Sequence, residues 1–293
     1  MTVLLGIDAG GTRTRLRLAR PDGTVLARAE HSAEDWPALG VEDKARAVES
    51  WLGELTGTPP SAVGLGAHGC DSEAECEQLR IAVQARLRAP VRVVNDAFLL
   101  IAAESAPSAG LVVGTGSVAV AWDHEGRALH TGGWGWLLGD PGSAWGTVRD
   151  AVRALHHAQD RGELDGDPLL PVLLRLAGAD SLREVKRRMQ RRPARSWAEW
   201  APQVHAVAGQ GSPAALAAIE SGAQSLVDNI GDLLVQGGRF SRVIGGGSVL
   251  VNQPRLAARI GDLLRERFDL TLCLYRGEPV AGALALAAQL LDG

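Results

Sequence analysis

Two copies of one short pattern, about a hundred residues apart, constrain the fold of this chain most. In each copy an apolar run enters a glycine–threonine turn and continues as a second run of alternating apolar residues; the turns read Gly-Gly-Thr at 10–12 and Gly-Thr-Gly at 114–116. Glycine lets backbone approach backbone or phosphate closely, and successive N–H groups in such a turn form an anion-binding concavity. Because a repeated supersecondary unit indicates related domain cores, the sequence predicts two similar halves that hold a nucleotide between them.

Strand and helix signals follow the same order in both halves. The first half predicts strands at 3–8, 15–20, 24–30, 62–67 and 91–94 and helices at 41–55 and 72–88. The second half predicts strands at 110–113, 118–122, 128–131, 242–244 and 270–275, a mostly helical stretch over 142–237, and helices at 255–267 and 279–291. Ser72 and Glu75 form a capping-box pattern, which predicts that a helix begins at this serine.

Composition sets limits on the function. A chain of 293 residues with 46% hydrophobic content can form two domains, and its net charge of −4 argues against nucleic acid as the main partner. No apolar run is long enough to cross a membrane and no basic segment precedes the first strand, so we expect neither a transmembrane helix nor a signal peptide. Cys70, Cys76 and Cys273 have neither disulfide-framework nor zinc spacing, which predicts a reduced, cytoplasmic setting. The basic run at 186–192 is interpreted as a solvated helix face.

Three further segments, taken with the two turns, resemble a known family. Residues 243–248 read Val-Ile-Gly-Gly-Gly-Ser, residues 93–97 read Val-Val-Asn-Asp-Ala, and residues 278–283 read Glu-Pro-Val-Ala-Gly-Ala. In this order they resemble the adenosine motif, the acceptor-side aspartate segment and the closing small-residue helix of the sugar-kinase/Hsp70/actin superfamily. Within it, the chain is similar to the N-acetylglucosamine kinase and BadF-BadG-BcrA-BcrD ATPase family over essentially its whole length.

The resemblance implies an α/β fold of two ribonuclease H-like (actin-like ATPase) domains flanking an interdomain nucleotide cleft. It implies a first domain of residues 1–105 plus 281–293 and a second domain of residues 106–280 with helical insertions. It also implies a homodimer with a small-molecule sugar substrate, no nucleic-acid partner and no membrane.

The activity that the resemblance implies is transfer of the γ-phosphate of ATP, with Mg²⁺, to the 6-hydroxyl of N-acetylglucosamine or glucosamine. The positions it assigns to the ATP phosphates and adenosine are Gly10, Gly11, Thr12, Arg13, Gly114, Thr115, Gly116, Gly245, Gly246 and Gly247. Asp8 ends a strand beside the first turn, where a carboxylate suits Mg²⁺ bound through water; the alternative is an aspartate that caps the turn. For Arg13 the alternative to the terminal phosphate is a surface position at a hairpin tip.

Asp96 is predicted to be the general base, since a carboxylate can accept the proton of a sugar hydroxyl as the P–O bond forms. The alternative is a helix N-cap, and both roles are compatible. The positions that the resemblance assigns to the sugar are Glu34, Asp96, Gly133, Trp134 and Asp140. For Asp140 the alternative is a turn or cap residue before a helix. Trp136 and Trp145 are interpreted as core aromatics.

Three positions depart from the family pattern. Glu34 and Val118 stand where the N-acetylglucosamine kinases have asparagine, and His68 lies after the strand at 62–67, where the family has small residues. His68 is predicted either to approach Asp96 or the sugar or to be an ordinary loop residue. Two other functions stay open: an ATPase activator of 2-hydroxyacyl-CoA dehydratases, and a sugar-responsive regulator without catalysis.

Overall fold

A computed structural model describes residues 2–11, 13–33 and 35–291. The contacts within the chain form two compact units. The first unit is Met1–Ala106 with Arg276–Gly293, and the second is Pro107–Tyr275. Each unit has its own five-stranded sheet, and each is described here by itself.

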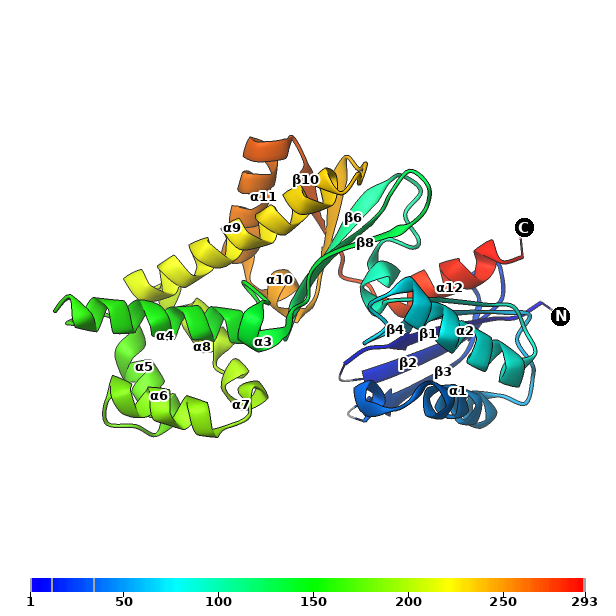
Figure 1. The fold of residues 1–293 in the computed structure, drawn as a ribbon, viewed down its shortest axis with the longest axis horizontal. Coiled ribbons are helices and arrows are strands. Elements are labelled where there is room, and N and C mark those ends of the chain that lie inside the picture. Colours follow the sequence, from blue (N-terminus) through cyan, green and yellow to red (C-terminus); the bar gives the residue numbers. More distant parts are fainter. Residues whose placement is uncertain (1, 12, 34, 292–293) are drawn as a thin grey trace. The chain divides into compact units, whose positions relative to one another are not determined.

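The sheet of the first unit has the order β3-β2-β1-β4-β5 (Figure 1). Its strands are β1 (Leu4–Ala9), β2 (Arg13–Ala19), β3 (Val25–Ser32), β4 (Ala62–Ala67) and β5 (Val91–Val94). Strand β2 runs antiparallel to its neighbours β1 and β3, and β4 and β5 continue the sheet in parallel with β1. The C-terminal ends of β1, β4 and β5 therefore meet at one edge, where α/β folds place their ligands.

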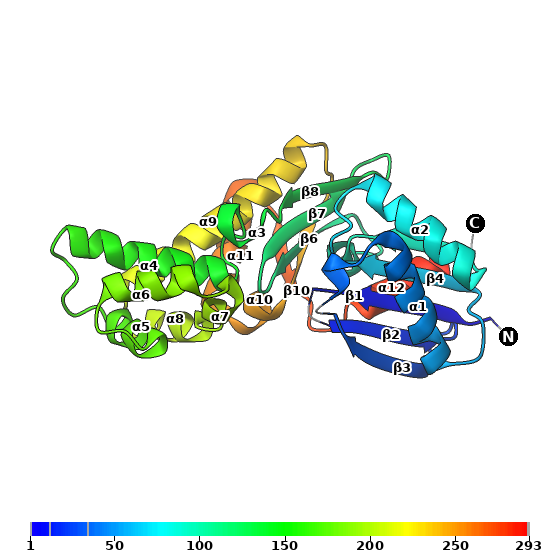
Figure 2. The same cartoon turned by 60° about the horizontal axis from the view of Figure 1, so that its bottom comes forward.

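Helices cover both faces of this sheet. The side chains of β1 alternate between the two faces and all are buried, so each face needs a covering layer. Leu5, Ile7 and Ala9 pack into a core with α1 (Val41–Leu55) and α2 (Glu73–Leu87). The opposite face is covered by α12 (Val280–Gln289), which returns from the end of the chain (Figure 2). Two 3-10 helices complete the unit, η1 (Trp36–Ala38) and η2 (Asp96–Leu100).

The sheet of the second unit has the order β10-β9-β6-β7-β8. Its strands are β6 (Ser108–Val113), β7 (Ser117–Trp122), β8 (Ala128–Gly132), β9 (Arg242–Gly246) and β10 (Thr271–Leu274). Strands β6 to β8 are antiparallel and β9 and β10 are parallel to β6, as in the first unit. The predicted pair of related α/β halves is thus confirmed strand by strand.

Most helices of the chain belong to the second unit. They are α3 (Gly135–Leu138), α4 (Ala144–Asp160), α5 (Leu169–Ala177), α6 (Leu182–Arg191), α7 (Ala194–Ala198), α8 (Ala201–Ala208), α9 (Pro213–Val235), α10 (Ser248–Asn252) and α11 (Pro254–Phe268). The long helices α4 and α9 pack against each other, and their apolar faces join β6 and β7 in one core. The insertion predicted between 142 and 237 is therefore helical throughout its length, apart from its turns.

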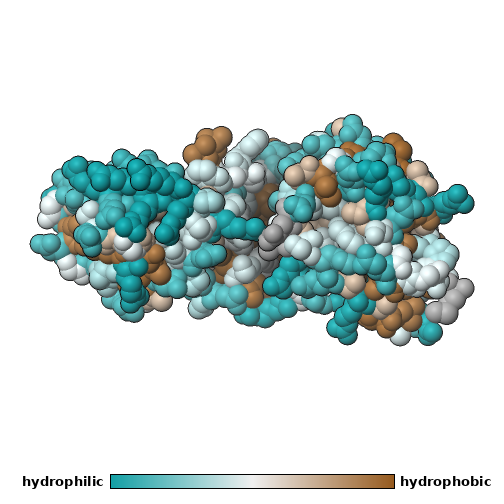
Figure 3. Space-filling model, turned by 90° about the horizontal axis from the view of Figure 1, so that it is seen from below, coloured by the Kyte–Doolittle hydropathy of each residue, from teal (hydrophilic) through white to brown (hydrophobic). Residues whose placement is uncertain are grey.

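Three local predictions can be compared directly with this structure. Ser72 and Glu75 form the expected capping box at the start of α2. On α6, Leu182 and Val185 are buried while most of the basic run faces solvent. Hydrophilic residues, in teal, cover much of the surface seen in Figure 3. Across residues 2–11, 13–33 and 35–291, no helix combines the length and apolarity that crossing a bilayer requires.

Candidate functional site

Asp8 lies near the end of β1 and is only 6% exposed. Its neighbour across the hairpin is Arg15, whose Nη1 is 3.6 Å from Asp8 Oδ2. Burial, followed by the negative charge of Asp96, raises the pKa of Asp8 to about 7, and Arg15 offsets only part of this shift. The carboxylate thus lies in a place that disfavours its charge unless a cation is added.

Asp96 follows β5 and begins η2. The cap of this short helix is its neighbour, because the Asn95 side chain accepts the Ala97 N–H at 3.0 Å. Asn95 is held in turn by a bond from its Nδ2 to Asp71 Oδ1, 2.9 Å away. Capping is therefore done by Asn95, and the partly exposed Asp96 carboxylate is left available for another role.

The first glycine turn brings these two carboxylates together. A methyl group placed on Gly10 would lie 3.8 Å from Asp8 Oδ1 and 3.7 Å from Asp96 Oδ2. The turn is closed by a bond from the Gly10 N–H to the Arg13 carbonyl. Arg13 itself is exposed and pairs with Glu30. The predicted phosphate and sugar residues Thr12 and Glu34 lie outside the described residues.

The donor set fits Mg²⁺ bound in the manner expected from the sequence. Two hard carboxylate oxygens flank one turn, and Asp8 is destabilised in its charged form by burial and by its neighbour. The described residues contain no group of three or more His, Cys, Asp or Glu side chains that could enclose a metal ion. An ion held by Asp8 would therefore keep several waters, as Mg²⁺ commonly does beside phosphates.

The raised pKa of Asp8 predicts a pH-dependent stability. A buried carboxyl group with a raised pKa stabilises the fold fully below the unfolded value of about 4. That contribution is lost as the pH rises from there through about 7. Asn at position 8 stays neutral at every pH. We therefore expect the free energy of unfolding of Asp8→Asn at pH 8 to exceed that of the unliganded wild type by roughly 1–4 kcal/mol, with a higher melting temperature. At pH 5 the two proteins should be closer in stability. Thermal melts at both pH values check this, and an Asp8→Asn protein that is less stable at pH 8 would contradict it.

The second turn lies between β6 and β7 and is held by Asp140. The Gly114 N–H donates to the Gly116 carbonyl, and Thr115 is exposed at the tip. Asp140 is 3% exposed; its Oδ1 accepts the Ser117 N–H at 3.2 Å and its Oδ2 accepts Trp145 Nε1–H at 2.7 Å. The Asp140 carboxylate thus holds the backbone of Ser117, the first residue after the second turn, in place.

The three-glycine segment at the end of β9 adjoins the same turn. Gly247 has φ +92°, and a Cβ there would lie 2.4 Å from the Val113 carbonyl oxygen, so only glycine fits. A Cβ on Gly114 would be 3.8 Å from the Ser248 N–H and Oγ. Gly245 and Gly246 complete β9. The structure therefore brings together the predicted second phosphate motif and the predicted adenosine motif.

The glycine–tryptophan loop after β8 presents an aromatic surface. Gly133 has φ +74° and donates its N–H to the Ser117 carbonyl, and a methyl group on it would lie 3.5 Å from Val118 Cγ2. Trp134 is 76% exposed. The prediction that Trp136 is a core residue is wrong, since it is 44% exposed; its indole packs against Trp197 in a T-shaped arrangement. Trp145 packs against the core as expected.

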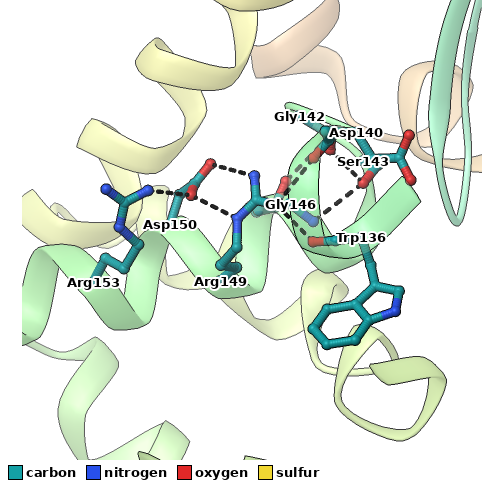
Figure 4. A network of polar contacts seen from close by, with 10 residues as sticks. Trp136, Asp140, Gly142, Ser143, Gly146, Arg149, Asp150 and Arg153 are labelled. Atoms are coloured by element: carbon teal, nitrogen blue, oxygen red, sulfur yellow. Dashed lines mark hydrogen bonds and ion pairs between the residues drawn. The ribbon is translucent and has the colours of Figure 1, made fainter. Parts of the chain in front are cut away.

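Arg149, on α4, is the residue of this loop that the sequence did not single out. Its Nη1 donates to the Trp136 carbonyl at 2.8 Å and the Gly139 carbonyl at 2.9 Å, and its Nε pairs with Asp150 (Figure 4). Arg153 pairs with the same aspartate. The guanidinium thus closes α3, whose last carbonyls have no helical partner.

Asp140→Ala tests what this buried carboxylate does. The change leaves the Ser117 N–H and the Trp145 Nε1–H without their acceptor, so the second turn loosens. For a kinase of the kind expected from the sequence, the KM for ATP should rise at least about tenfold, the worth of one charge-assisted hydrogen bond, and the KM for sugar should change less. Asp262→Ala, on an exposed carboxylate of α11, is the matched control. A rise in the sugar KM alone would instead support the predicted sugar contact of Asp140.

Comparisons with known proteins agree with this arrangement. Residues 5–287 match the model of the BadF/BadG/BcrA/BcrD ATPase family. An N-acetylmuramic acid/N-acetylglucosamine kinase of Clostridium acetobutylicum is 29% identical over 58% of this chain and 60% of its own length. An N-acetyl-D-glucosamine kinase of Dictyostelium discoideum is 27% identical over 54% of this chain and 56% of its own. The chain thus spans less than two thirds of the curated relatives it matches.

Solved structures extend the likeness over the whole chain. A Chromobacterium violaceum protein provisionally assigned as an N-acetylglucosamine kinase is 28% identical, with a TM-score of 0.71 over 98% of this chain and 99% of its own. A ROK family glucokinase from Streptomyces griseus, solved with glucose and AMPPNP, is 18% identical with a TM-score of 0.60 over 99% of this chain and 100% of its own, which supports the fold alone. The expected actin-like fold of the two halves is confirmed by these matches. The chain belongs to the BadF/BadG/BcrA/BcrD ATPase family.

Proposed function

We propose that this protein is an ATP- and Mg²⁺-dependent kinase that phosphorylates the 6-hydroxyl of an amino sugar, N-acetylglucosamine first and glucosamine second. The two domains that the sequence predicts would hold ATP and sugar between them. The observation that carries the proposal is the position of Asp96. Its carboxylate does not cap η2, because Asn95 does, and it lies with Asp8 at the first glycine turn.

Each group of residues has a distinct part in phosphoryl transfer, which needs positioning and charge stabilisation more than covalent chemistry. The two glycine turns would bind phosphate through backbone N–H groups. Asp96 would orient the acceptor hydroxyl and accept its proton. Mg²⁺ held by Asp8 through water would neutralise charge on the phosphate oxygens.

The names of the relatives support the choice of sugar. Two curated relatives are named as N-acetylglucosamine kinases, one of them also for N-acetylmuramic acid, and the matching Chromobacterium violaceum structure carries the same assignment. The exposed indole of Trp134 adds a flat apolar surface of the kind that packs against the C–H face of a sugar ring.

Measurement of ADP release with ATP, Mg²⁺ and a panel of hexoses, hexosamines and N-acetylhexosamines tests the proposal. We expect release to depend on an amino sugar, and phosphorus NMR of the product to place the phosphate on the 6-hydroxyl. Equal ADP release with and without every sugar would contradict the proposal and favour an ATPase that activates a partner enzyme.

The choice between the two sugars depends on Glu34, for which the family has an amide. A carboxylate there would form a charge-assisted hydrogen bond with the ammonium of glucosamine, worth roughly 1.5–3 kcal/mol, whereas an amide can both donate to and accept from an acetamido group. We expect Glu34→Gln to shift the ratio of kcat/KM toward N-acetylglucosamine. An unchanged ratio would show that Glu34 does not recognise the 2-substituent.

A further inference from the structure

His68 is held at the carboxyl edge of the first sheet by its own backbone. It follows β4; its N–H donates to the Ala9 carbonyl at 2.8 Å, and its carbonyl accepts Trp36 Nε1–H at 3.2 Å. Trp36 is buried in the core of the first unit. The main chain of this loop residue is therefore fixed to Ala9, the last residue of β1, directly before the first turn.

The imidazole of His68 lies between the first glycine turn and Asp96. Its Nδ1 is 3.6 Å from Asp96 Oδ2, and a methyl group on Gly11 would lie 3.3 Å from its Nε2. A hydrogen bond requires a shorter distance, but such contacts tighten when substrate binds. The side chain is 48% exposed, so a bound ligand can reach it.

The charges around the ring favour this contact. The groups that face it are Asp96 and Asp71, which raise the pKa of His68, and Lys44 of α1, which together with burial lowers it. The balance raises the pKa, with the Asp96 contact as the largest cause. Within the part of the chain that the structure describes, His68 is the one basic side chain within 4 Å of the Asp96 carboxylate.

We propose that His68 is a positioning residue, whose imidazole orients the Asp96 carboxylate toward the acceptor hydroxyl beside the first glycine turn. This inference rests on the proposed kinase function. The acceptor proton passes to Asp96 as the new O–P bond forms and the bond from the γ-phosphorus to the bridging oxygen of ATP breaks, with ADP as the leaving group. His68 contributes a donor that fixes the carboxylate without itself receiving that proton. Glycine at position 11 leaves the space that the ring occupies.

Two substitutions at His68 separate this role from a merely structural one. His68→Leu removes the donor, whereas His68→Asn keeps an N–H near the place of Nδ1. We expect His68→Leu to lower kcat by roughly 10–100-fold, the cost of a misplaced reacting group, with the KM for ATP unchanged, and His68→Asn to restore most of the loss. His124→Leu is the matched control, because His124 Nε2 lies at the same distance, 3.6 Å, from Glu125 Oε1 on the surface of the second unit.

A double-mutant cycle tests whether His68 acts through Asp96. In the Asp96→Asn background, His68→Leu should cause little further loss of kcat. Unchanged kcat in His68→Leu, equal losses in both backgrounds, or a loss that His68→Asn does not restore would each overturn the inference.

An NMR titration of the His68 ring distinguishes failure of this inference from failure of the proposed function. The pKa of the ring should fall in Asp96→Asn relative to the wild type, whether or not any sugar is phosphorylated. A wild type without sugar-dependent turnover would reject the kinase proposal and, with it, the catalytic purpose of the contact. An unchanged His68 pKa in Asp96→Asn would reject the contact itself, and this measurement also serves if His68→Leu fails to fold.

Discussion

Asp96→Asn should fold and bind ATP as the wild type does, yet lose roughly 10²–10⁴ in kcat, the usual contribution of a positioned general base. The amide keeps the size of the side chain but cannot accept a proton from the acceptor hydroxyl. The helix η2 should be unaffected, because Asn95 and not Asp96 provides its cap. Steady-state kinetics with the preferred sugar and a direct measurement of nucleotide binding check the two parts of this prediction.

The control for this variant is Asp269→Asn, the same chemical change at an exposed position. Asp269 ends α11 with φ +56°, a conformation that asparagine adopts readily. We expect wild-type kcat from it. An Asp96→Asn enzyme with wild-type kcat would show that Asp96 is not the base, whereas loss of ATP binding together with kcat would indicate a disturbed first turn.

Local patterns were sufficient to predict most strands and helices, and the resemblance to a known family predicted how they assemble. Glycine turns, alternating strands and the capping box at Ser72 are signals of short range, and the structure shows the elements that they predict. Asn95 and Asp96 are a case that such signals cannot decide. Both residue types cap helices well, so the sequence alone could not indicate which of the two would be free. In the structure Asn95 caps the helix.

The surroundings of the glycine–tryptophan loop could not be predicted because they depend on how successive elements pack. Asp140 is buried where its carboxylate accepts both the Ser117 N–H at the start of β7 and the Trp145 Nε1–H of α4. Arg149 is an ordinary arginine in a helical pattern until its guanidinium meets the carbonyls of α3. Trp136 has the composition of a core residue, yet it lies on a short exposed helix. No local signal distinguishes these cases.

Gly64→Ala should strongly destabilise the fold, through the packing of α12 on β4. A Cβ at this position would lie 1.9 Å from the carbonyl oxygen of Ala283 and 2.9 Å from the Ala287 N–H, so the helix backbone must move. Overpacking of a close contact costs roughly 1–3 kcal/mol, and more where backbone must yield. Urea unfolding of the variant should show this loss in the first unit, where α12 also covers Gly6 of β1.

Gly53→Ala provides the matched control, since it adds the same methyl group in α1, where nothing lies within 4 Å of the new Cβ. Alanine is favoured over glycine within a helix by about 1 kcal/mol, so this variant should be more stable than the wild type. The two glycine-to-alanine changes therefore have opposite expected signs, which chain entropy alone cannot produce. Equal stabilisation by both would mean that α12 does not approach β4 closely, and the packing that supports the strand of Asp8 would have to be reconsidered.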